Sequence, residues 1–162
     1  MRVPYHHQHT DYTCGPTALE MVFDHFKKHV KERTIARIAR TTKKYGTFHK
    51  GMIDAARKEG FYCYVHENAS ISQVRHFLDE GLPVIVHYKE PVDNDGHYAV
   101  AVGYGKNALV LNDPWNGRNF RVSFKEFEKR WHDEIKGNQY TKWVMVVSPE
   151  KFELGKEYAP TK

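Results

Sequence analysis

The sequence predicts an α+β domain, in which helices from the first half of the chain pack on an antiparallel sheet from the second half. The chain has 162 residues, 40% of them hydrophobic, which suits one domain with a substantial core. Apolar residues recur at helical spacing before residue 60, and β-rich segments dominate after it. Because the helices precede the strands instead of alternating with them, a doubly wound parallel sheet is disfavoured.

Three helices are predicted in the first half. The first covers residues 15–29, and Pro16 occupies its first turn, a position that proline favours. The second covers about residues 33–43, and the third about residues 50–59. In each of them the apolar side chains gather on one side, so we expect all three to pack on the sheet or on one another.

The second half is predicted to form mainly strands. A helix over about residues 71–80, opened by Ser70 or Ser72, interrupts them, and Gly81 ends it. A second short helix is expected near residues 123–131. The predicted strands cover residues 61–66, 83–88, 97–104, 108–113 and 142–147.

The domain is expected to span residues 1–150, with residues 151–162 as a C-terminal tail. The last part of this tail, LGKEYAPTK (154–162), is predicted to be a frayed end. No run approaches the roughly 20 apolar residues of a membrane-spanning helix. The N-terminus has no apolar segment typical of a signal peptide. We therefore expect a cytoplasmic domain without a membrane segment.

Charge and cysteine content narrow the function classes. The net charge is +5, but 25 basic and 20 acidic residues are interspersed, which is typical of solvated helix faces and not of a nucleic-acid-binding surface. Two cysteines, Cys14 and Cys63, exclude a disulfide scaffold and a four-cysteine zinc site. One disulfide between them is formally open, though a cytoplasmic chain disfavours it. Cys63 lies inside a predicted strand and is interpreted as a small buried hydrophobe.

Cys14 is the candidate nucleophile. It directly precedes the first predicted helix, whose unpaired amides and positive end favour a thiolate. Gly15 leaves room for a substrate chain to approach the sulfur. The alternative is an inert buried cysteine, which is common in folded domains.

His97 is the candidate general base. Along the predicted strand it alternates onto one face with Ala99 and Ala101, so a large element can pack closely beside that face. We expect the helix that carries Cys14 to lie there. The alternative is a histidine at a strand start that backbone groups or water satisfy.

Asp113 is the candidate orienting group for the imidazole. A three-residue loop after Tyr104 pairs that residue with Ala108 and Ala99 with Asp113, which places Asp113 on the His97 face. A two-residue loop would place it on the opposite face unless a bulge intervenes. The alternative for Asp113 is a turn former in NDPWNG.

Gln8, on an extended entry segment, is the candidate oxyanion donor together with the Cys14 amide. Gly96, at the end of the loop KEPVDNDG (89–96), and Trp115 are expected to border the substrate cleft. The alternatives are an exposed hairpin loop and a tryptophan that packs in the core.

A metal site is weighed and set aside. Cys14, His97 and Asp113 together have the ligand types of a zinc site, and so do the histidines that flank Gln8, which are His6, His7 and His9. Consecutive residues on an extended segment point to opposite faces, so neighbouring histidines do not easily converge. We expect no metal and no cofactor.

Four segments carry a resemblance to a known family. VPYHHQHTDYTCGPTALEMV, GLPVIVHY, GHYAVAVGYG and LVLNDPWNG resemble the papain-like cysteine peptidases of family thirty-nine, over roughly residues 3–147. These include the double-glycine leader peptidases of bacteriocin exporters and their stand-alone relatives. The resemblance implies a papain-like fold with Cys14 as nucleophile, His97 as base, Asp113 as orienter and Gln8 as oxyanion donor.

The sequence also departs from that family. Exporter-linked members commonly have an aspartate directly before the cysteine, where this chain has Thr13 and places Asp11 two residues earlier. No transporter domain follows, so a separate transporter partner stays open. The expected function is hydrolysis of an extended peptide substrate by a cysteine peptidase. The alternatives are a catalytically silent peptide-binding module and an acyl- or peptidyltransferase on the same scaffold.

Overall fold

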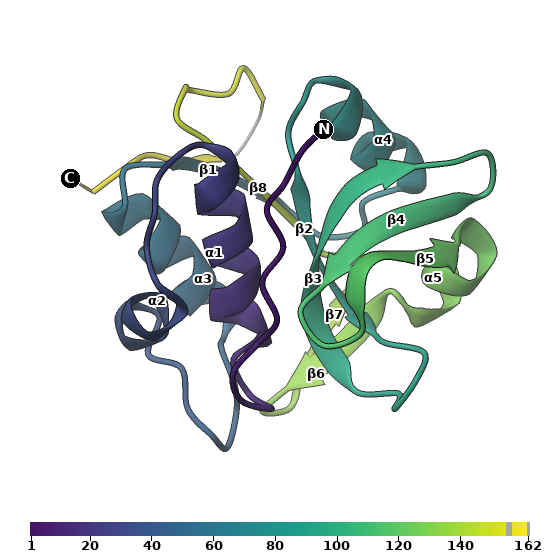
Figure 1. Ribbon diagram of the computed structural model, residues 1–162, viewed down its shortest axis with the longest axis horizontal. Helices are drawn as coiled ribbons and strands as arrows, with labels where there is room; N and C mark the ends of the chain where they lie inside the picture. Colours follow the sequence, from purple (N-terminus) through teal and green to yellow (C-terminus); the bar gives the residue numbers. More distant parts are fainter. Residues whose placement is uncertain (155–156, 162) are drawn as a thin grey trace.

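The structure, a computed structural model, describes residues 1–154 and 157–161, and its elements form layers around a sheet (Figure 1). Helices α1 (Cys14–His25), α2 (Glu32–Ile38) and α3 (His49–Lys58) lie on one side of the sheet. Helices α4 (Ile71–Asp79) and α5 (Phe124–Arg130) pack on the other side. Helices on both faces bury the sheet and create one core on each side.

The main sheet has seven antiparallel strands in the order β5-β4-β3-β2-β8-β1-β9. A separate hairpin pairs β6 (His132–Ile135) with β7 (Asn138–Thr141). The strands of the main sheet are β1 (Tyr62–His66), β2 (Val84–Lys89), β3 (Gly96–Tyr104), β4 (Ala108–Asp113), β5 (Gly117–Ser123), β8 (Val144–Ser148) and β9 (Glu157–Tyr158).

The predicted helices and the α+β class are confirmed, but two helices end earlier than predicted. α1 ends at His25 and α2 at Ile38. Just beyond these ends, Lys27 and Arg40 adopt left-handed backbone angles, with φ of 63° and 56°, which stop a helix. Lysine and arginine favour helices, so their sequence pattern does not predict these stops. Within the described ranges, no helix is long and apolar enough to cross a membrane.

All the predicted strands are present, and the structure adds β5, β6, β7 and β9. β5 is an edge strand with mostly exposed side chains, and the β6–β7 hairpin is largely polar. Such strands lack the apolar run or alternation that sequence analysis requires. The sequence signal for the β6–β7 hairpin was the dipeptide Lys136-Gly137. In the structure these two residues have positive φ angles of 51° and 83°, which suit a two-residue hairpin turn.

The predicted frayed end at residues 154–162 is wrong for its described part. β9 pairs with β1 and closes that edge of the sheet. The Arg57 guanidinium of α3 donates to the Ala159 carbonyl oxygen at 2.7 Å, which holds the following segment. The edge of the sheet and the Arg57 guanidinium are brought to this place only by folding of the domain. The composition of the tail therefore does not predict that the tail binds there. The prediction also covered residues 155–156 and 162, which lie outside the described residues.

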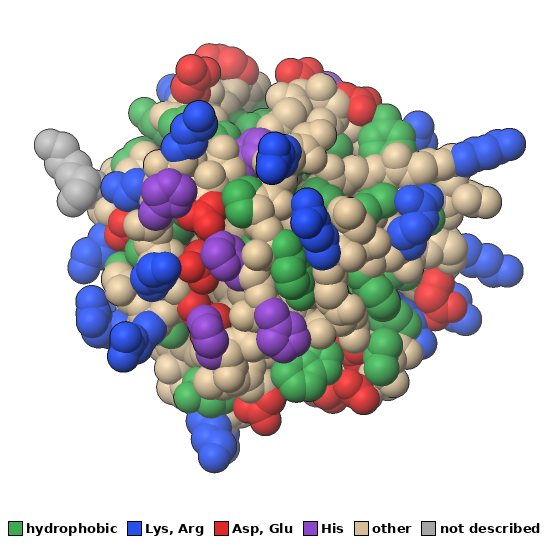
Figure 2. Space-filling view, in the orientation of Figure 1, with side chains coloured by type: hydrophobic (Ala, Val, Ile, Leu, Met, Phe, Trp, Pro, Cys, Tyr) green, Lys and Arg blue, Asp and Glu red, His purple; other side chains and the backbone are tan. Residues whose placement is uncertain are grey.

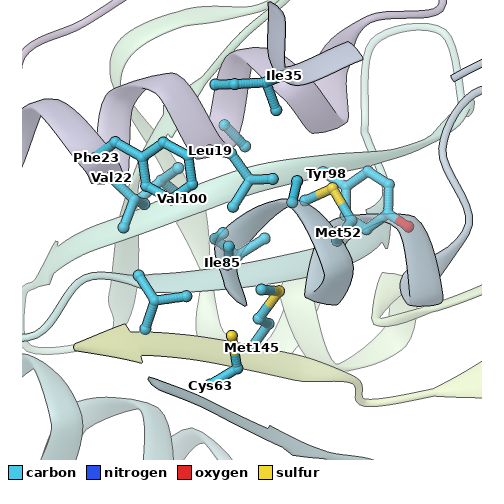
Figure 3. Packing of buried hydrophobic residues seen from close by; sticks show 14 of the residues in the cluster. Leu19, Val22, Phe23, Ile35, Met52, Cys63, Ile85, Tyr98, Val100 and Met145 are labelled. Carbon is cyan, nitrogen blue, oxygen red and sulfur yellow. The ribbon is translucent and has the colours of Figure 1, made fainter. Parts of the chain in front are cut away.

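Two hydrophobic cores lie on opposite faces of the sheet. The first, between α1–α3 and the sheet, includes Leu19, Ile85 and Met145 (Figure 3). Cys63 is fully buried in it, as predicted, and burial raises the pKa of its thiol to about 12. Cys63 therefore acts as a packing residue.

The prediction that α1 packs on the small-residue face of β3 is wrong. Tyr98 and Val100 belong to the first core, which contains α1. Ala99 and Ala101 belong to the second core, together with side chains such as Phe77 of α4. The small residues therefore accommodate the bulky side chains of the second core. The alternation itself was correct, but it does not say which element covers which face.

A capping box fixes the start of α4 and gives a stability prediction. The Ser70 hydroxyl accepts from the Gln73 amide at 3.1 Å, and the Gln73 side chain accepts from the Ser70 amide at 2.9 Å. We expect Ser70→Ala to lower the free energy of unfolding by about 1 kcal/mol in urea denaturation. Ser72→Ala, at an exposed position in the first turn, is the matched control. Equal losses in the two variants would contradict this assignment.

Candidate active site

A cleft of about 420 Å³ brings most of the predicted site residues together. Its lining includes Cys14, His97 and Gln8, as well as Gly96 and Trp115. It lies where the extended N-terminal segment reaches α1, at the end of the sheet at which β3 begins (Figure 1). His97 is on the side of β3 that packs in the second core, away from α1. It nevertheless lines the same cleft as Cys14, because it lies at the very start of β3.

Cys14 is the first residue of α1 and is half-buried. Gly15, the next residue, does not line the cleft. It faces packed side chains instead, since a Cβ there would lie 2.9 Å from the Met52 sulfur and 3.0 Å from the Thr47 hydroxyl. The missing side chain therefore lets α1 approach its neighbours closely, a packing role where sequence analysis predicted space for substrate.

Burial disfavours the thiolate form of Cys14. Burial raises its pKa to about 12, and the Asp113 charge acts in the same direction. Hydrogen bonds from the backbone amides of Tyr98, Gly15 and Cys14 itself lower the pKa, but they do not offset burial. The start of the helix alone therefore does not hold a thiolate, and the site needs a base to remove the proton.

His97 and Asp113 form the predicted pair. The His97 Nε2 lies 2.9 Å from the Asp113 Oδ2, and both side chains are buried. This contact leaves the His97 Nδ1 without another hydrogen bond among the described residues. The imidazole is therefore fixed by one nitrogen, while the other is free for a proton of the cleft.

Asp113 is held by five hydrogen bonds to its carboxylate, the longest of which comes from the Asn116 side chain at 3.4 Å. Besides His97, the Tyr88 hydroxyl donates to Oδ2 at 2.5 Å, and the Trp115 and Asn116 amides donate to Oδ1, each at 2.9 Å. Burial opposes ionisation, but the His97 contact, with Tyr88 and Asn116, holds the pKa of Asp113 below its ordinary value. Asp113 is therefore an ionised acceptor at neutral pH.

A bulge in β3 brings Asp113 to this position. Near the turn, Tyr104 pairs with Leu109 and not with Ala108, so the predicted loop length is wrong by one residue. The register then shifts between Ala101 and Gly103, beyond which Val100 pairs with Asn112. Asp113 follows Asn112 at the end of β4, and its carboxylate reaches the His97 ring from there at 2.9 Å. The turn is one residue longer than predicted, and the bulge adds one residue to β3, so the two changes in register offset each other.

The extended entry segment fixes Gln8 beside this pair. The Gln8 backbone N–H donates to the Pro114 carbonyl at 3.0 Å, and the Tyr5 hydroxyl donates to the Asp113 backbone carbonyl at 2.7 Å. The Gln8 Nε2 donates to the Thr10 carbonyl at 2.7 Å, which uses one of its two N–H groups. The Gln8 Oε1 is buried without a partner among the described residues. The side chain is thus oriented, and one N–H is left for a ligand.

Trp115 borders the cleft, and its alternative as a core residue is wrong. Its side chain is 44% exposed and stacks on His7, with ring centroids 5.8 Å apart. The neighbouring histidines have partners of their own: His6 contacts Asp24, and His9 contacts Glu32. In the described part of the chain, no three His, Cys, Asp or Glu side chains are arranged to hold a metal ion.

A second polar chain borders the cleft, and sequence analysis missed it. The His49 Nε2 lies 2.8 Å from the His87 Nδ1, and the His87 Nε2 lies 2.7 Å from the Asp133 Oδ2. The Lys89 ammonium lies 3.3 Å from the other Asp133 oxygen. These contacts join α3, β2 and β6, so they attach the hairpin to the sheet. His87 inside an otherwise apolar strand was the available signal.

The same chain gives Gly96 its role. A Cβ on Gly96 would lie about 2 Å from the Asp133 carboxylate, at 2.0 Å from its Oδ2. Any other residue there would push the hairpin away from the start of β3, directly before His97. Gly96 lines the cleft as predicted, and the structure adds that it makes space for Asp133.

Comparisons with known proteins identify the family and agree with the fold. The chain matches the model of the Peptidase_C39 like family over residues 1–139. No curated protein matches it. The peptidase domain of ComA from Streptococcus, a bi-functional ABC transporter involved in quorum sensing, shares 23% identity at a TM-score of 0.75, over 92% of this chain and 100% of that domain.

Two further structures show the same fold. A double-glycine-motif protease from an AMS/PCAT transporter, in complex with the leader peptide, has a TM-score of 0.71 and 21% identity, over 92% of this chain and 93% of that one. A protein from Bacillus anthracis, proposed to be a C39-like peptidase, has a TM-score of 0.72 and 17% identity, over 91% and 94%. The predicted papain-like architecture is therefore confirmed.

The buried histidine chain predicts acid lability. Burial lowers the pKa of His49 from 6.5 to about 2, and the neighbouring His87 acts in the same direction. Below pH 6.5 the unfolded chain therefore binds a proton at His49 that the folded chain does not bind until about pH 2. We expect His49 to cost stability by about 1.4 kcal/mol per pH unit below pH 6.5.

Urea denaturation at pH 7 and pH 5 checks this expectation. The wild-type protein should lose roughly 2 kcal/mol more than His49→Gln between these two pH values. His132→Gln, which removes an exposed histidine, should follow the wild type. The same pH dependence in wild type and His49→Gln would show that His49 does not stay neutral in the fold.

Proposed function

The chain belongs to the Peptidase_C39 like family, and from this premise we propose that it is a cysteine peptidase that hydrolyses peptide bonds with Cys14, His97 and Asp113. The observation that carries the proposal is the buried His97–Asp113 pair, which opens onto the cleft that Cys14 lines. Asp113 engages the Nε2 and so leaves the Nδ1 as the nitrogen that accepts the thiol proton.

The first half of the reaction forms a thioester. The His97 Nδ1 takes the proton from the Cys14 sulfur as that sulfur attacks the carbonyl carbon of the scissile bond. The developing oxyanion accepts hydrogen bonds from the Cys14 amide and from the N–H of Gln8 that Thr10 does not use. The C–N bond then breaks, and the imidazolium gives its proton to the leaving amine.

The second half restores the enzyme. A water molecule attacks the thioester carbonyl and loses a proton to His97, the C–S bond breaks, and the thiolate regains that proton as the acid leaves. Asp113 stays ionised throughout and stabilises the imidazolium, as its lowered pKa supports.

Alkylation tests the Cys14–His97 pair without knowledge of the substrate. We expect iodoacetamide to modify Cys14 at pH 7, and His97→Ala to slow this by about 100-fold, because the thiol then has no base to receive its proton. Rates between pH 5 and pH 9, followed by peptide mass mapping, measure the effect. Cys63 is the internal control and should stay unmodified because it is fully buried. Equal rates in both proteins would remove His97 from the mechanism.

Peptide cleavage tests the reaction itself. The related AMS/PCAT protease is a double-glycine-motif enzyme seen with a leader peptide, so peptides with that motif are the first substrates to assay. We expect cleavage by wild type and by Cys63→Ala, and none by Cys14→Ala. An added amine that appears in the product would identify a transferase. Peptide binding without cleavage in wild type would instead favour a silent binding module.

A further inference from the structure

Three lysines with no carboxylate partner border the cleft on one side. Lys43 and Lys44 come from the loop before α3, and Lys136 comes from the β6–β7 turn. Tyr45 lies among them: the Lys44 ammonium is 5.2 Å from the centre of its ring and the Lys136 ammonium 5.5 Å. We call these four residues the lysine wall. Two cations from distant parts of the chain thus converge on one ring.

Rigid turns hold the lysine wall in place. The loop closes through paired backbone hydrogen bonds between Thr42 and Gly46, at 2.9 and 2.7 Å. The Tyr45 amide also donates to the Thr42 hydroxyl at 3.1 Å. Lys136 sits in a two-residue hairpin turn, and the Asp133–His87 contact fixes that hairpin to the sheet. The backbone that carries the wall is therefore held in place, so a ligand has to order only the lysine side chains.

The charges of the lysine wall are not neutralised within the protein. Among the described residues, no carboxylate lies within ion-pair distance of Lys43, Lys44 or Lys136. Six other lysine and arginine side chains do have such a partner, and these are Lys28, Arg40, Lys50, Lys89, Arg130 and Lys142. Like charges held close together repel one another. An anionic ligand group would relieve that repulsion and add a cation–anion contact.

The other side of the cleft is acidic. Asp93 and Asp95 lie on the loop before β3, and their carboxylates have no partner among the described residues. The buried Glu90 carboxylate shapes this loop by accepting from the amides of Asp93 and Asp95, at 2.7 and 3.2 Å. Figure 1 shows this loop at the lower right and the loop of the lysine wall at the lower left, and Figure 2 shows red and blue side chains gathered at these places.

We propose that the lysine wall binds a carboxylate of the substrate, so that the preferred substrate is a peptide with an acidic group on one side of the scissile bond only. This inference rests on the proposed peptidase function. Asp93 and Asp95 repel the same group on the other side, which fixes the direction in which the peptide lies. Asp11 and Glu134 also line the cleft, and the test includes them as charged positions outside both loops.

A glutamate scan tests the preference. Each position on both sides of the cleavage site of a neutral, amide-capped peptide is changed to Glu or to Gln. We expect the kcat/KM ratio of Glu to Gln peptides to reach about 5 on one side and to stay at or below 1 on the other. The double variant Lys44→Gln/Lys136→Gln should bring the favourable ratio close to 1. About 0.5 M salt should weaken it, because exposed charges are screened.

Matched controls separate charge reading from a general charge effect. Lys106→Gln/Lys125→Gln removes the same two charges from exposed positions outside the cleft and should leave every ratio unchanged. Asp11→Asn and Glu134→Gln should not reduce the favourable ratio. A second peptide pair, with a free or an amidated C-terminus, tells whether the wall binds a side-chain carboxylate or the end of the chain. Ratios near 1 in wild type for both kinds of carboxylate would overturn the inference.

The outcome is separable from that of the proposed function. If wild type cleaves neutral peptides with no ratio above 1, the peptidase stands and the inference fails. If wild type cleaves nothing, the peptidase function fails. Equilibrium binding of the same fluorescent Glu and Gln peptides to Cys14→Ala then decides the inference alone: tighter Glu binding that Lys44→Gln/Lys136→Gln abolishes supports it, and equal binding overturns it.

Discussion

The buried carboxylate of Asp113 is the point on which the arrangement of the site depends. A charge in this position is tolerable only because hydrogen bonds surround it, and these come from β2, from β3 and from the turn after β4. The carbonyl of the same residue accepts from Tyr5, so the extended N-terminal segment joins the network. One desolvated charge thereby sets the relative positions of the imidazole, the entry segment and the turn that presents Trp115.

The two cores explain why the cleft forms where it does. The sheet is covered on both faces along most of its length, so reactive groups have room only at its end, where the helical layer and the sheet meet at the start of β3. The β6–β7 hairpin borders this end and is attached by polar contacts through His87 and Asp133 instead of by a large apolar surface. Because this attachment is polar, the border that the hairpin gives the cleft is also polar, as a site for a polar peptide backbone requires.

Sequence analysis predicted the elements with strong periodicity and the residues placed by them. The strand alternation around His97 followed from a period of two, and Cys14 followed from its place before an apolar helix. The contact of His97 with Asp113 was predicted from a turn length that is wrong, and it forms because the bulge in β3 compensates. β5 and the β6–β7 hairpin pair with neighbouring segments, and they were missed because their exposed or polar residues give no clear strand pattern. β9 and the His49–His87 chain were missed because their partners come from distant segments. The prediction of which element packs on each face of β3 was wrong, because alternation defines two faces but does not say which element covers each of them.

The bulge in β3 uncouples two parts of one hairpin. The stretch next to the turn follows one register and the stretch next to the site follows another, with the shift between Ala101 and Gly103. A residue gained or lost at the tip of this hairpin can therefore be absorbed where the register already changes, and the pairing of Val100 with Asn112 is kept. The tip is thus a place where insertions, tags or grafted loops can be placed with little transmission to the reactive groups at the far end of the same strands.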